Sequence, residues 1–515
     1  MRADFWENAK TTSSDKASKK PLTRAEFDEF STLLENSFTF GSLSDPHKSG
    51  PAPKSNSSGT TPPAWNGTFF VYDRTGKEAL LSKAVLRLRS SDEEVPQVSK
   101  VTIGGVEALK IERKSGVTYW VENGKYAVSA NERSVLEEIL ARLAGKSTSQ
   151  DSLGQSPAFR EALPTFDGGL LQFFIRIPDL KQLAGDANAS GIPAAKLIDA
   201  AKLSAVHSIC GHITLDGAKT RFQFAILGDA SADTPFDIWS DGQAVPPSLA
   251  FVPASAVYYN STQLNLLGIY TTIKRISRAV LPPAQQGGAD MLEMLAQAKL
   301  GMTLQDALSA LTGEFASIQT SPSLDPDSLI FFLGVNKKPE TLKLIHILFT
   351  DHVAAEQNEG DVTLLKISSV SGPAAATASP DHFNHLVITS GAIFGAGRAE
   401  SVHEFFAKHG KAPTSDPLAA LASFRTARAQ FPEKVTGLSY ADFQKIDWPA
   451  AKARWVADQA KAAAASSSTA KSAQEKKTID WLARANPQVF PRHLHSSFGA
   501  SWKDDKGIHF DQWIQ

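Results

Sequence analysis

The stretch Val117–Lys146, VTYWVENGKYAVSANERSVLEEILARLAGK, decides the fold because it contains a turn, the two strands beside it and a helix. Val117–Val121 and Tyr126–Val128 are rich in β-branched and aromatic residues, and they flank Asn123-Gly124, a dipeptide typical of tight hairpin turns. Ser129–Glu132 has the capping-box pattern, so we expect a helix that ends near the next glycine. The stretch therefore predicts an antiparallel hairpin followed by a helix.

The neighbouring segments predict more structure of the same kind. Before the stretch we expect a strand at Phe69–Tyr72, a helix, and a hairpin that turns at Gly104-Gly105. After it we expect a buried strand at Leu170–Ile177 and a hairpin that turns at Asp216-Gly217. Near the start of the chain, apolar residues at helical spacing predict a helix that continues to Phe38.

Three sets of matched residues indicate that this order occurs twice. Phe69-Phe70 matches Phe331-Phe332 at an offset of 262, Tyr119–Val121 lines up with Leu386–Ile388 at 267, and VHSICGHITLDG from Val206 resembles LHSSFGASWKDD from Leu494 at 288. Offsets that grow along the chain are what insertions in surface loops produce. The sequence therefore predicts a tandem duplication.

The predicted fold class is α+β, and each half has antiparallel sheets flanked by helices. We expect the first half at residues 1–245 and the second at 246–515. The Pro-, Gly- and Ser-rich tract at residues 41–66 predicts a mobile loop, and the low-complexity segment 461–477 predicts a linker.

The predicted duplication has a consequence for the start of the chain. The second half is expected to open with a strand at Leu249–Tyr259 before a helix at Leu264–Val280, whereas the first half opens directly on a predicted helix. We therefore expect that the matching strand would lie before Met1, so that either the reading frame starts late or the strand has been lost. Any export signal would be missing together with it.

Composition excludes several classes of protein. The 515 residues carry 53 Lys and Arg against 54 Asp and Glu, a net charge of −1, so no general attraction to nucleic acid or to an anionic membrane is expected. The single cysteine, Cys210, excludes an intramolecular disulfide and a multi-thiolate metal site. No apolar run is long enough to predict a transmembrane helix, and the polar Met1–Lys20 segment shows no signal peptide.

Part of the chain resembles a known family. The segments YAVSANERSVLEEILARLAGK from Tyr126, SPAFREAL from Ser156 and LLQFFIRIPDL from Leu170 are similar to bacterial proteins grouped as domain of unknown function 3352. The resemblance is clearest over Val117–Leu183 and weaker over Ser248–Asp447. It implies an envelope or secreted protein with an N-terminal signal or membrane anchor, and it supplies no catalytic residues.

His382 and His385 are the only metal candidates, and they are weak ones. They lie three positions apart, a spacing that on a helix could bring both imidazoles to one metal ion. The adjacent Pro380 and the predicted strand at Leu386–Ile388 favour a loop instead. We therefore expect neither a bound metal nor a cofactor.

Two other segments have a structural interpretation beside a functional one. Gly395–Arg398 follows a strand and opens a helix, where backbone amides can bind a phosphate, but it lacks the third glycine of a dinucleotide site and is better explained as a tight turn. Cys210 lies near His207 and His212, yet a small buried core residue is the simpler interpretation of it.

These patterns favour a non-enzymatic, exported or envelope-associated binding or structural protein that uses a cleft or surface between its duplicated halves. The expected partner is a macromolecule or an amphiphile. The alternatives are a hydrolase with dispersed Ser, His and Asp side chains, and a cytoplasmic scaffold. The expected location is the periplasm or the exterior if an N-terminal segment is missing, and the cytoplasm otherwise.

Overall fold

The fold is described from a computed structural model. Apart from a few isolated residues, the structure describes residues 38–42, 68–81, 97–113, 116–146, 153–162, 171–177, 192–217, 219–231, 233–280, 301–349, 352–368, 384–411, 414–465 and 490–515.

The chain forms two compact units, Met1–Gln155 and Ser156–Gln515. Each contains an antiparallel sheet with helices, which confirms the α+β class. The units do not coincide with the predicted halves 1–245 and 246–515, because strands from both sides of residue 245 pair in one sheet of the second unit.

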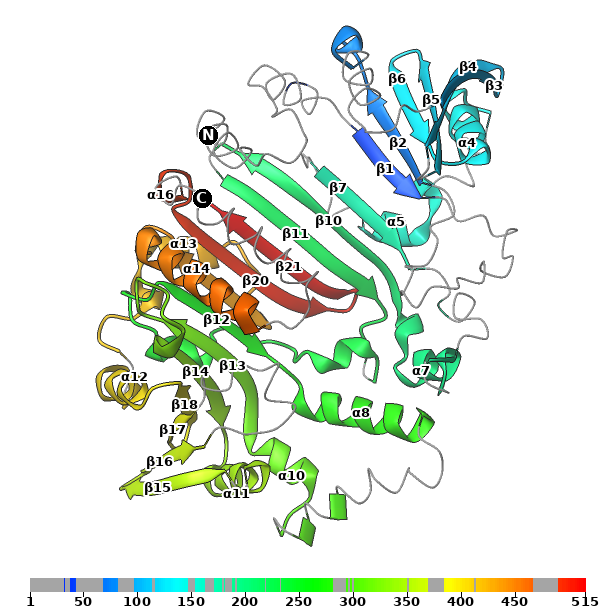
Figure 1. The fold of residues 1–515 in the computed structure, drawn as a ribbon. Helices are drawn as coiled ribbons and strands as arrows, with labels where there is room; N and C mark the ends of the chain where they lie inside the picture. The colour runs from blue at the N-terminus through cyan, green and yellow to red at the C-terminus, as the bar shows by residue number, and fades with distance from the viewer. Residues whose placement is uncertain are drawn as a thin grey trace. The chain divides into compact units, whose positions relative to one another are not determined.

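The first unit has a six-stranded antiparallel sheet (Figure 1). From edge to edge its strands are β1 (Phe38–Ser42), β2 (Thr68–Asp73), β6 (Tyr126–Ala130), β5 (Gly116–Asn123), β4 (Val106–Arg113) and β3 (Gln97–Ile103). Gly104 and Gly124 adopt positive φ in the two predicted hairpin turns. Helix α4 (Arg133–Leu143) buries Leu136 and Leu140 against one face of this sheet.

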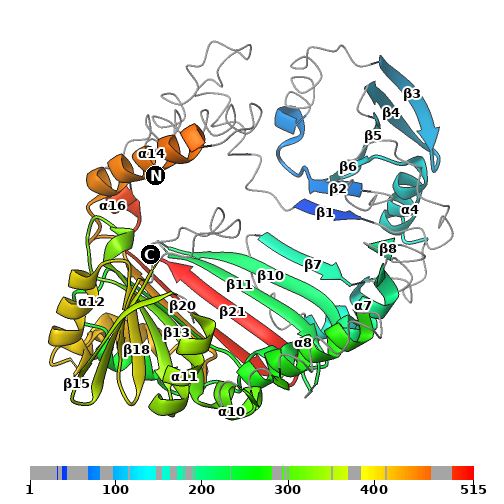
Figure 2. The same cartoon turned by 60° about the horizontal axis from the view of Figure 1, so that its bottom comes forward.

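The second unit contains a 13-stranded sheet, which Figure 2 shows curving from β15 to β7. In spatial order its strands are β15 (Val353–Glu359), β16 (Val362–Ile367), β17 (His385–Ile388), β18 (Ala392–Ala396), β14 (Leu329–Val335), β13 (Leu311–Gln319), β12 (Tyr258–Gln263), β19 (Gly437–Asp442), β20 (Ser496–Asp504), β21 (Gly507–Ile514), β11 (Lys219–Gly228), β10 (Val206–Asp216) and β7 (Leu171–Arg176). A separate pair joins β8 (Asn188–Ala189) to β9 (Ile192–Pro193).

Helices cover much of this sheet. They are α5 (Pro157–Ala162), α7 (Ala194–Ala200), α8 (Leu266–Val280), α10 (Leu304–Ser309), α11 (Lys338–Leu348), α12 (Ala399–Phe405), α13 (Ala422–Arg428), α14 (Trp448–Ala465) and α16 (Phe490–His493). The largest apolar core lies beneath α12 and α13, where Phe394, Phe424 and Phe498 are buried. A second core lies beneath α11, around Ile345 and Ile393.

One order of strands is present in both sheets. The order β2-β6-β5-β4-β3 in the first unit corresponds to β14-β18-β17-β16-β15 in the second, with α4 and α12 following the last hairpin of each. Within the second unit, a first triplet, β7-β10-β11, has the same order as a second triplet, β19-β20-β21. The two triplets meet where β11 pairs with β21.

Several sequence predictions need correction. The strand expected at Leu249–Tyr259 is wrong for most of its length: Leu249–Phe251 end the 3-10 turn Pro247–Phe251, Pro253 lies within the segment and offers no backbone donor, and β12 starts only at Tyr258. Phe38, expected at the end of a helix, begins β1.

Two further expectations concern the loop and the linker. Gly41 and Ser42 belong to β1, and the remainder of the predicted loop 41–66 lies outside the described residues. The predicted linker 461–477 begins inside α14, which continues to Ala465 because alanine is the strongest helix former. The rest of this linker lies outside the described residues.

Candidate functional site

The most unusual surface of the second unit is one face of β7, β10, β11 and β21. We define the open apolar face by eight side chains that share this side of the sheet through direct cross-strand pairing: Leu171, Phe173, Ile175, Ile213, Leu215, Phe222, Phe224 and Phe510. None of the eight is charged. The exposed fraction is 38% for Phe173, 39% for Phe222 and 58% for Leu215, which is high for such large apolar groups.

Three aromatic rings form a row across this face. Phe173 on β7, Phe224 on β11 and Phe510 on β21 are aligned by register, with Gly211 between the first two. The ring centroids are 6.3 Å apart for Phe173 and Phe224, and 5.5 Å apart for Phe224 and Phe510. A methyl group at Gly211 would lie 2.7 Å from the Phe173 ring, so the absence of a side chain there lets that ring lie flat over the strand.

The opposite face of the same strands is an ordinary core. Cys210 and Ala225 pack there with Ala162 of α5, and Phe159 meets Phe174 edge to face at 5.1 Å. At the junction of the triplets, the guanidinium group of Arg221 donates hydrogen bonds to both carboxylate oxygens of Asp511, and Asp511 is 2% exposed. The sheet therefore has one side anchored by packing and by an ion pair to the buried Asp511, and one side left apolar and accessible.

Only one end of the open apolar face is covered by described residues. The 3-10 turn Pro235–Ile238 places Phe236 over Ile508, and both are almost completely buried. Next to this turn lies a cleft of about 400 Å³ whose lining includes Trp239, Asp241 and Lys503. The Lys503 ammonium lies 3.6 Å from the Asp241 carboxylate.

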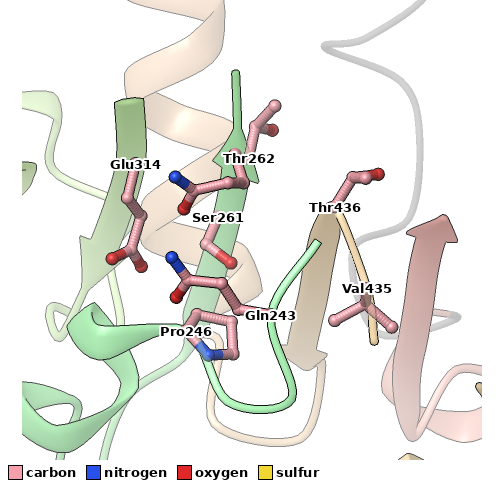
Figure 3. Close-up of a pocket in the computed structure, with 8 residues that line it drawn as sticks. Gln243, Pro246, Ser261, Thr262, Glu314, Val435 and Thr436 are labelled. Carbon is pink, nitrogen blue, oxygen red and sulfur yellow. The ribbon is translucent and has the colours of Figure 1, made fainter. Parts of the chain in front are cut away.

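A second group of polar side chains lies between β12 and β13 and is shown in Figure 3. Glu314, Ser261 and Gln243 gather there, in a space too small for a water molecule. The Ser248 hydroxyl donates to Glu314 at 2.5 Å and lies 2.8 Å from the Tyr259 hydroxyl. Burial raises the pKa of Glu314, although the hydrogen bonds from Ser248 oppose that shift.

This cluster is structural. Ser248 is 0% exposed and Glu314 1%, so a substrate cannot reach either side chain. Ser248 belongs to the turn Pro247–Phe251, and its amide also donates to Glu314 at 3.1 Å. The carboxylate therefore fastens this turn to β13, and the Ser-Glu pair offers no accessible nucleophile.

Of the two metal candidates, the structure describes only His385. His385 is the first residue of β17 and lies opposite Lys366 of β16, while His382 lies outside the described residues. Burial, followed by the nearby Lys366, lowers the pKa of His385. Among the residues that the structure describes, no group of three His, Cys, Asp or Glu side chains has an arrangement that could hold a metal ion.

The other two sequence candidates have structural positions. Arg398 precedes α12 and binds Asp327 at 2.5 Å, so its charge is already neutralised by a carboxylate. Cys210 is fully buried, and burial raises the pKa of its thiol to about 11, which disfavours the reactive thiolate.

Sequence reasoning missed the open apolar face, although LQFFIR in β7 carried a signal: Leu171, Phe173 and Ile175 alternate on one face of a strand that lies at a sheet edge. Comparisons of the chain with protein-family models, with curated proteins and with solved structures each found no match. Of the helices that the structure describes, none is both long enough and apolar enough to cross a bilayer.

Proposed function

We propose that this protein is a non-enzymatic binding protein that holds the apolar chain of an amphiphile on the open apolar face. The observation that carries the proposal is the row of Phe173, Phe224 and Phe510, uncharged and partly exposed beside Leu171 and Leu215. The face of an antiparallel sheet that meets solvent normally carries polar side chains, and a contiguous exposed apolar patch marks a binding surface.

The chemistry of the face favours an acyl chain over a protein surface. Protein interfaces combine an apolar centre with a polar rim and are rich in arginine and tyrosine. The eight side chains of the open apolar face are aliphatic or phenylalanine, which recognise a hydrocarbon through burial, and only Thr220 and Gln512 add polar groups on this side of the four strands, beside Leu215 and Phe222. Three strand spacings of roughly 4.8 Å separate β7 from β21, so the face is about 14 Å wide, enough for an extended chain of about ten carbons.

We also propose that the two triplets and the two five-strand orders descend from one duplicated unit. Support comes from backbone bonds that recur in register: the Ile177 amide donates to the His207 carbonyl, and the Phe443 amide donates to the His495 carbonyl. Phe159 meets Phe174 edge to face as Phe424 meets Tyr440. The open apolar face then spans the place where the two copies pair, between β11 and β21.

The proposal also covers where the protein acts and which family it belongs to. An exported or envelope-associated protein of the domain of unknown function 3352 family would meet lipid-like molecules at its site of action. Fractionation of cells that produce the native gene product, followed by immunodetection, tests the location. Recovery in the cytosol alone would contradict it.

The binding test uses a fluorescent long-chain fatty acid. We expect saturable binding to the full-length protein, and at least tenfold weaker binding for the double variant Phe173→Ser/Phe222→Ser, since each ring contributes about 1.5–3 kcal/mol of burial. Leu348→Ser is the control, because Leu348 is 66% exposed on α11, away from the face. Equal affinity of both variants, at unchanged thermal stability, would contradict the proposal.

A further inference from the structure

Strand β7 ends the 13-stranded sheet with an unusual edge. Its inner side pairs with β10 from Leu171 to Arg176, and no strand lies on its outer side among the residues that the structure describes. The strand reads LQFFIR, so four of its six residues are large and apolar. An exposed edge of this composition is a template for pairing with another chain.

Two of the other three edges of the two large sheets carry charged residues, whereas the third, β1, reads FTFGS and carries none. The opposite edge of the same sheet, β15, reads VAAEQNE, and Glu356 and Glu359 make its outer side charged. In the first unit, β3 reads QVSKVTI and has Lys100 at its centre. Charged residues within an edge strand resist unwanted pairing. The one charged residue of β7, Arg176, lies at the end of the strand, and Leu171–Ile175 is uncharged. We take this difference from β15 and β3 to mean that β7 has a partner strand.

The second triplet shows what kind of strand fits. β19 has the place of β7, since Tyr440 pairs with Phe498 as Phe174 pairs with Cys210. The outer side of β19 is occupied by β12, antiparallel, with Tyr259 opposite Tyr440. The other side of β12 pairs with β13, which in turn pairs with β14. In the first unit, β1 pairs with β2 in the way that β13 pairs with β14, but β1 has no strand on its other side and is the terminal strand of its sheet.

We propose that the outer edge of β7 binds an extended strand of another polypeptide, antiparallel and with the residue pattern of β12. The register that β12 has on β19 places an aromatic side chain of the incoming strand opposite Phe174, as Tyr259 lies opposite Tyr440. This inference is independent of amphiphile binding, because it uses the backbone edge of β7 and not the open apolar face.

The backbone of β7 identifies which amides would bind. The Ile177 amide donates to the His207 carbonyl, so the odd-numbered residues point their backbone groups toward β10. The alternate residues, Phe174 and Arg176 among them, point theirs outward. Arg176 directs its side chain away from the open apolar face, because it pairs with buried Ser208. A change at Arg176 can therefore block the edge without altering that face.

The probe is a fluorescently labelled peptide that copies residues 256–265, AVYYNSTQLN, which contains β12. We expect it to bind the full-length protein in a titration followed by fluorescence anisotropy. Two further peptides carry N-methyl groups on alternate residues, in opposite phases. An added strand uses only every second amide, so one methylated peptide keeps its affinity and the other loses at least tenfold.

The protein variants separate this site from the amphiphile site. Arg176→Pro removes one outward amide and keeps the bonds to β10, so we expect at least tenfold weaker peptide binding with unchanged fatty-acid binding. Phe222→Ser, on β11, should leave peptide binding unchanged. Circular dichroism verifies that both variants fold, and the two methylated peptides test the proposal on the unaltered protein.

Three results would overturn the proposal. One is absence of peptide binding at millimolar concentration; another is equal affinity for the two methylated phases. The third is a dimer of this protein that Arg176→Pro dissociates while the β12 peptide fails to bind, since that would make a second copy of the chain the partner.

Discussion

At the scale of single residues, Glu314 is the clearest case of a buried carboxyl group whose ionisation is disfavoured by burial. Its carboxylate is almost fully buried and accepts two hydrogen bonds from Ser248, one from the hydroxyl and one from the amide. Burial raises its pKa above the usual value of 4.5. The folded protein therefore holds a proton on this group more tightly than the unfolded chain does.

The sign of this shift predicts how stability depends on pH. The stabilising contribution of protonated Glu314 is fully present below its usual pKa of 4.5 and is lost as pH rises through the higher pKa of the folded state. Glu314→Gln keeps an acceptor for Ser248 and does not titrate. We expect its free energy of unfolding, relative to that of the native protein, to increase from about pH 4 to about pH 8 in urea titrations.

A control variant and a contrary outcome sharpen this test. Glu314→Ala leaves the Ser248 donors without an acceptor and should cost about 1–3 kcal/mol at every pH. A difference between native protein and Glu314→Gln that stays constant over the whole pH range would contradict the assigned role of the carboxylate.

Single residues were partly predictable. The sequence indicated that Cys210 is a buried core residue, because its matched partner is Phe498, and the structure buries both. Asp325 and Asp327 lie in a loop with nothing in the sequence to show their partners. The structure pairs Asp325 with Arg454 and Asp327 with Arg398, contacts that depend on how distant helices pack.

At the scale of elements, the place of β10 between β7 and β11 depends on Gly211. A methyl group there would lie 2.5 Å from the Gln223 carbonyl oxygen as well as 2.7 Å from the Phe173 ring. Since the nearest atom is backbone of the adjacent strand, it cannot move aside without disturbing the ladder.

We therefore expect Gly211→Ala to lower the free energy of unfolding by about 1–3 kcal/mol. Gly391→Ala is the matched control, because a methyl group at Gly391 meets no atom within 4 Å and its φ is not positive. Chemical denaturation of both variants measures the effect. Equal stability of the two would show that β10 and β7 adjust at Gly211 more freely than the register indicates.

Elements with local signals were predicted well. The hairpins that turn at Gly104, Gly124 and Gly217 are confirmed, since each turn needs positive φ and each glycine supplies it. The start of β13 cannot be predicted locally, because Leu311 lies at helical spacing from Leu304, Ala307 and Leu308, and this pattern favours a helix through Leu311. Its strand character comes from pairing with β12 and β14, which no local pattern reveals.

Matching strand pairs between the two sheets gives an alignment that differs by one residue from the predicted one. Val71 pairs with Val128 and Phe332 pairs with Phe394, and all four side chains face α4 or α12, so matching these pairs gives offsets of 261 and 266 instead of the predicted 262 and 267. A shift of one residue moves every side chain to the other face of a strand. Residue identity alone did not resolve this, because both faces of these strands are buried against helices.

At the scale of the whole molecule, the boundary between units was the least predictable feature. A boundary near residue 245 follows from the predicted repeat, whereas the compact units meet after Gln155. The reason is the pairing of β11 with β21, which joins residues almost 300 positions apart. Such a contact has no signature in either segment.

This boundary predicts the behaviour of two fragments. We expect residues 156–515 to unfold cooperatively on heating, because that fragment retains the whole 13-stranded sheet. We expect residues 246–515 to aggregate, because removal of β11 exposes the edge of β21. Circular dichroism and size-exclusion chromatography compare them, and a soluble, cooperatively folded 246–515 fragment would contradict the assignment.

The place of β21 has a consequence for how the protein is made. Strand β21 lies in the interior of the sheet, between β20 and β11, yet it comes later in the sequence than all the other strands that the structure describes. During synthesis, β10 and β11 emerge early and must wait for it, with a free edge on β11. Pairing between segments so far apart in sequence makes folding slow, and the free edge of β11 is open to aggregation until β21 pairs with it.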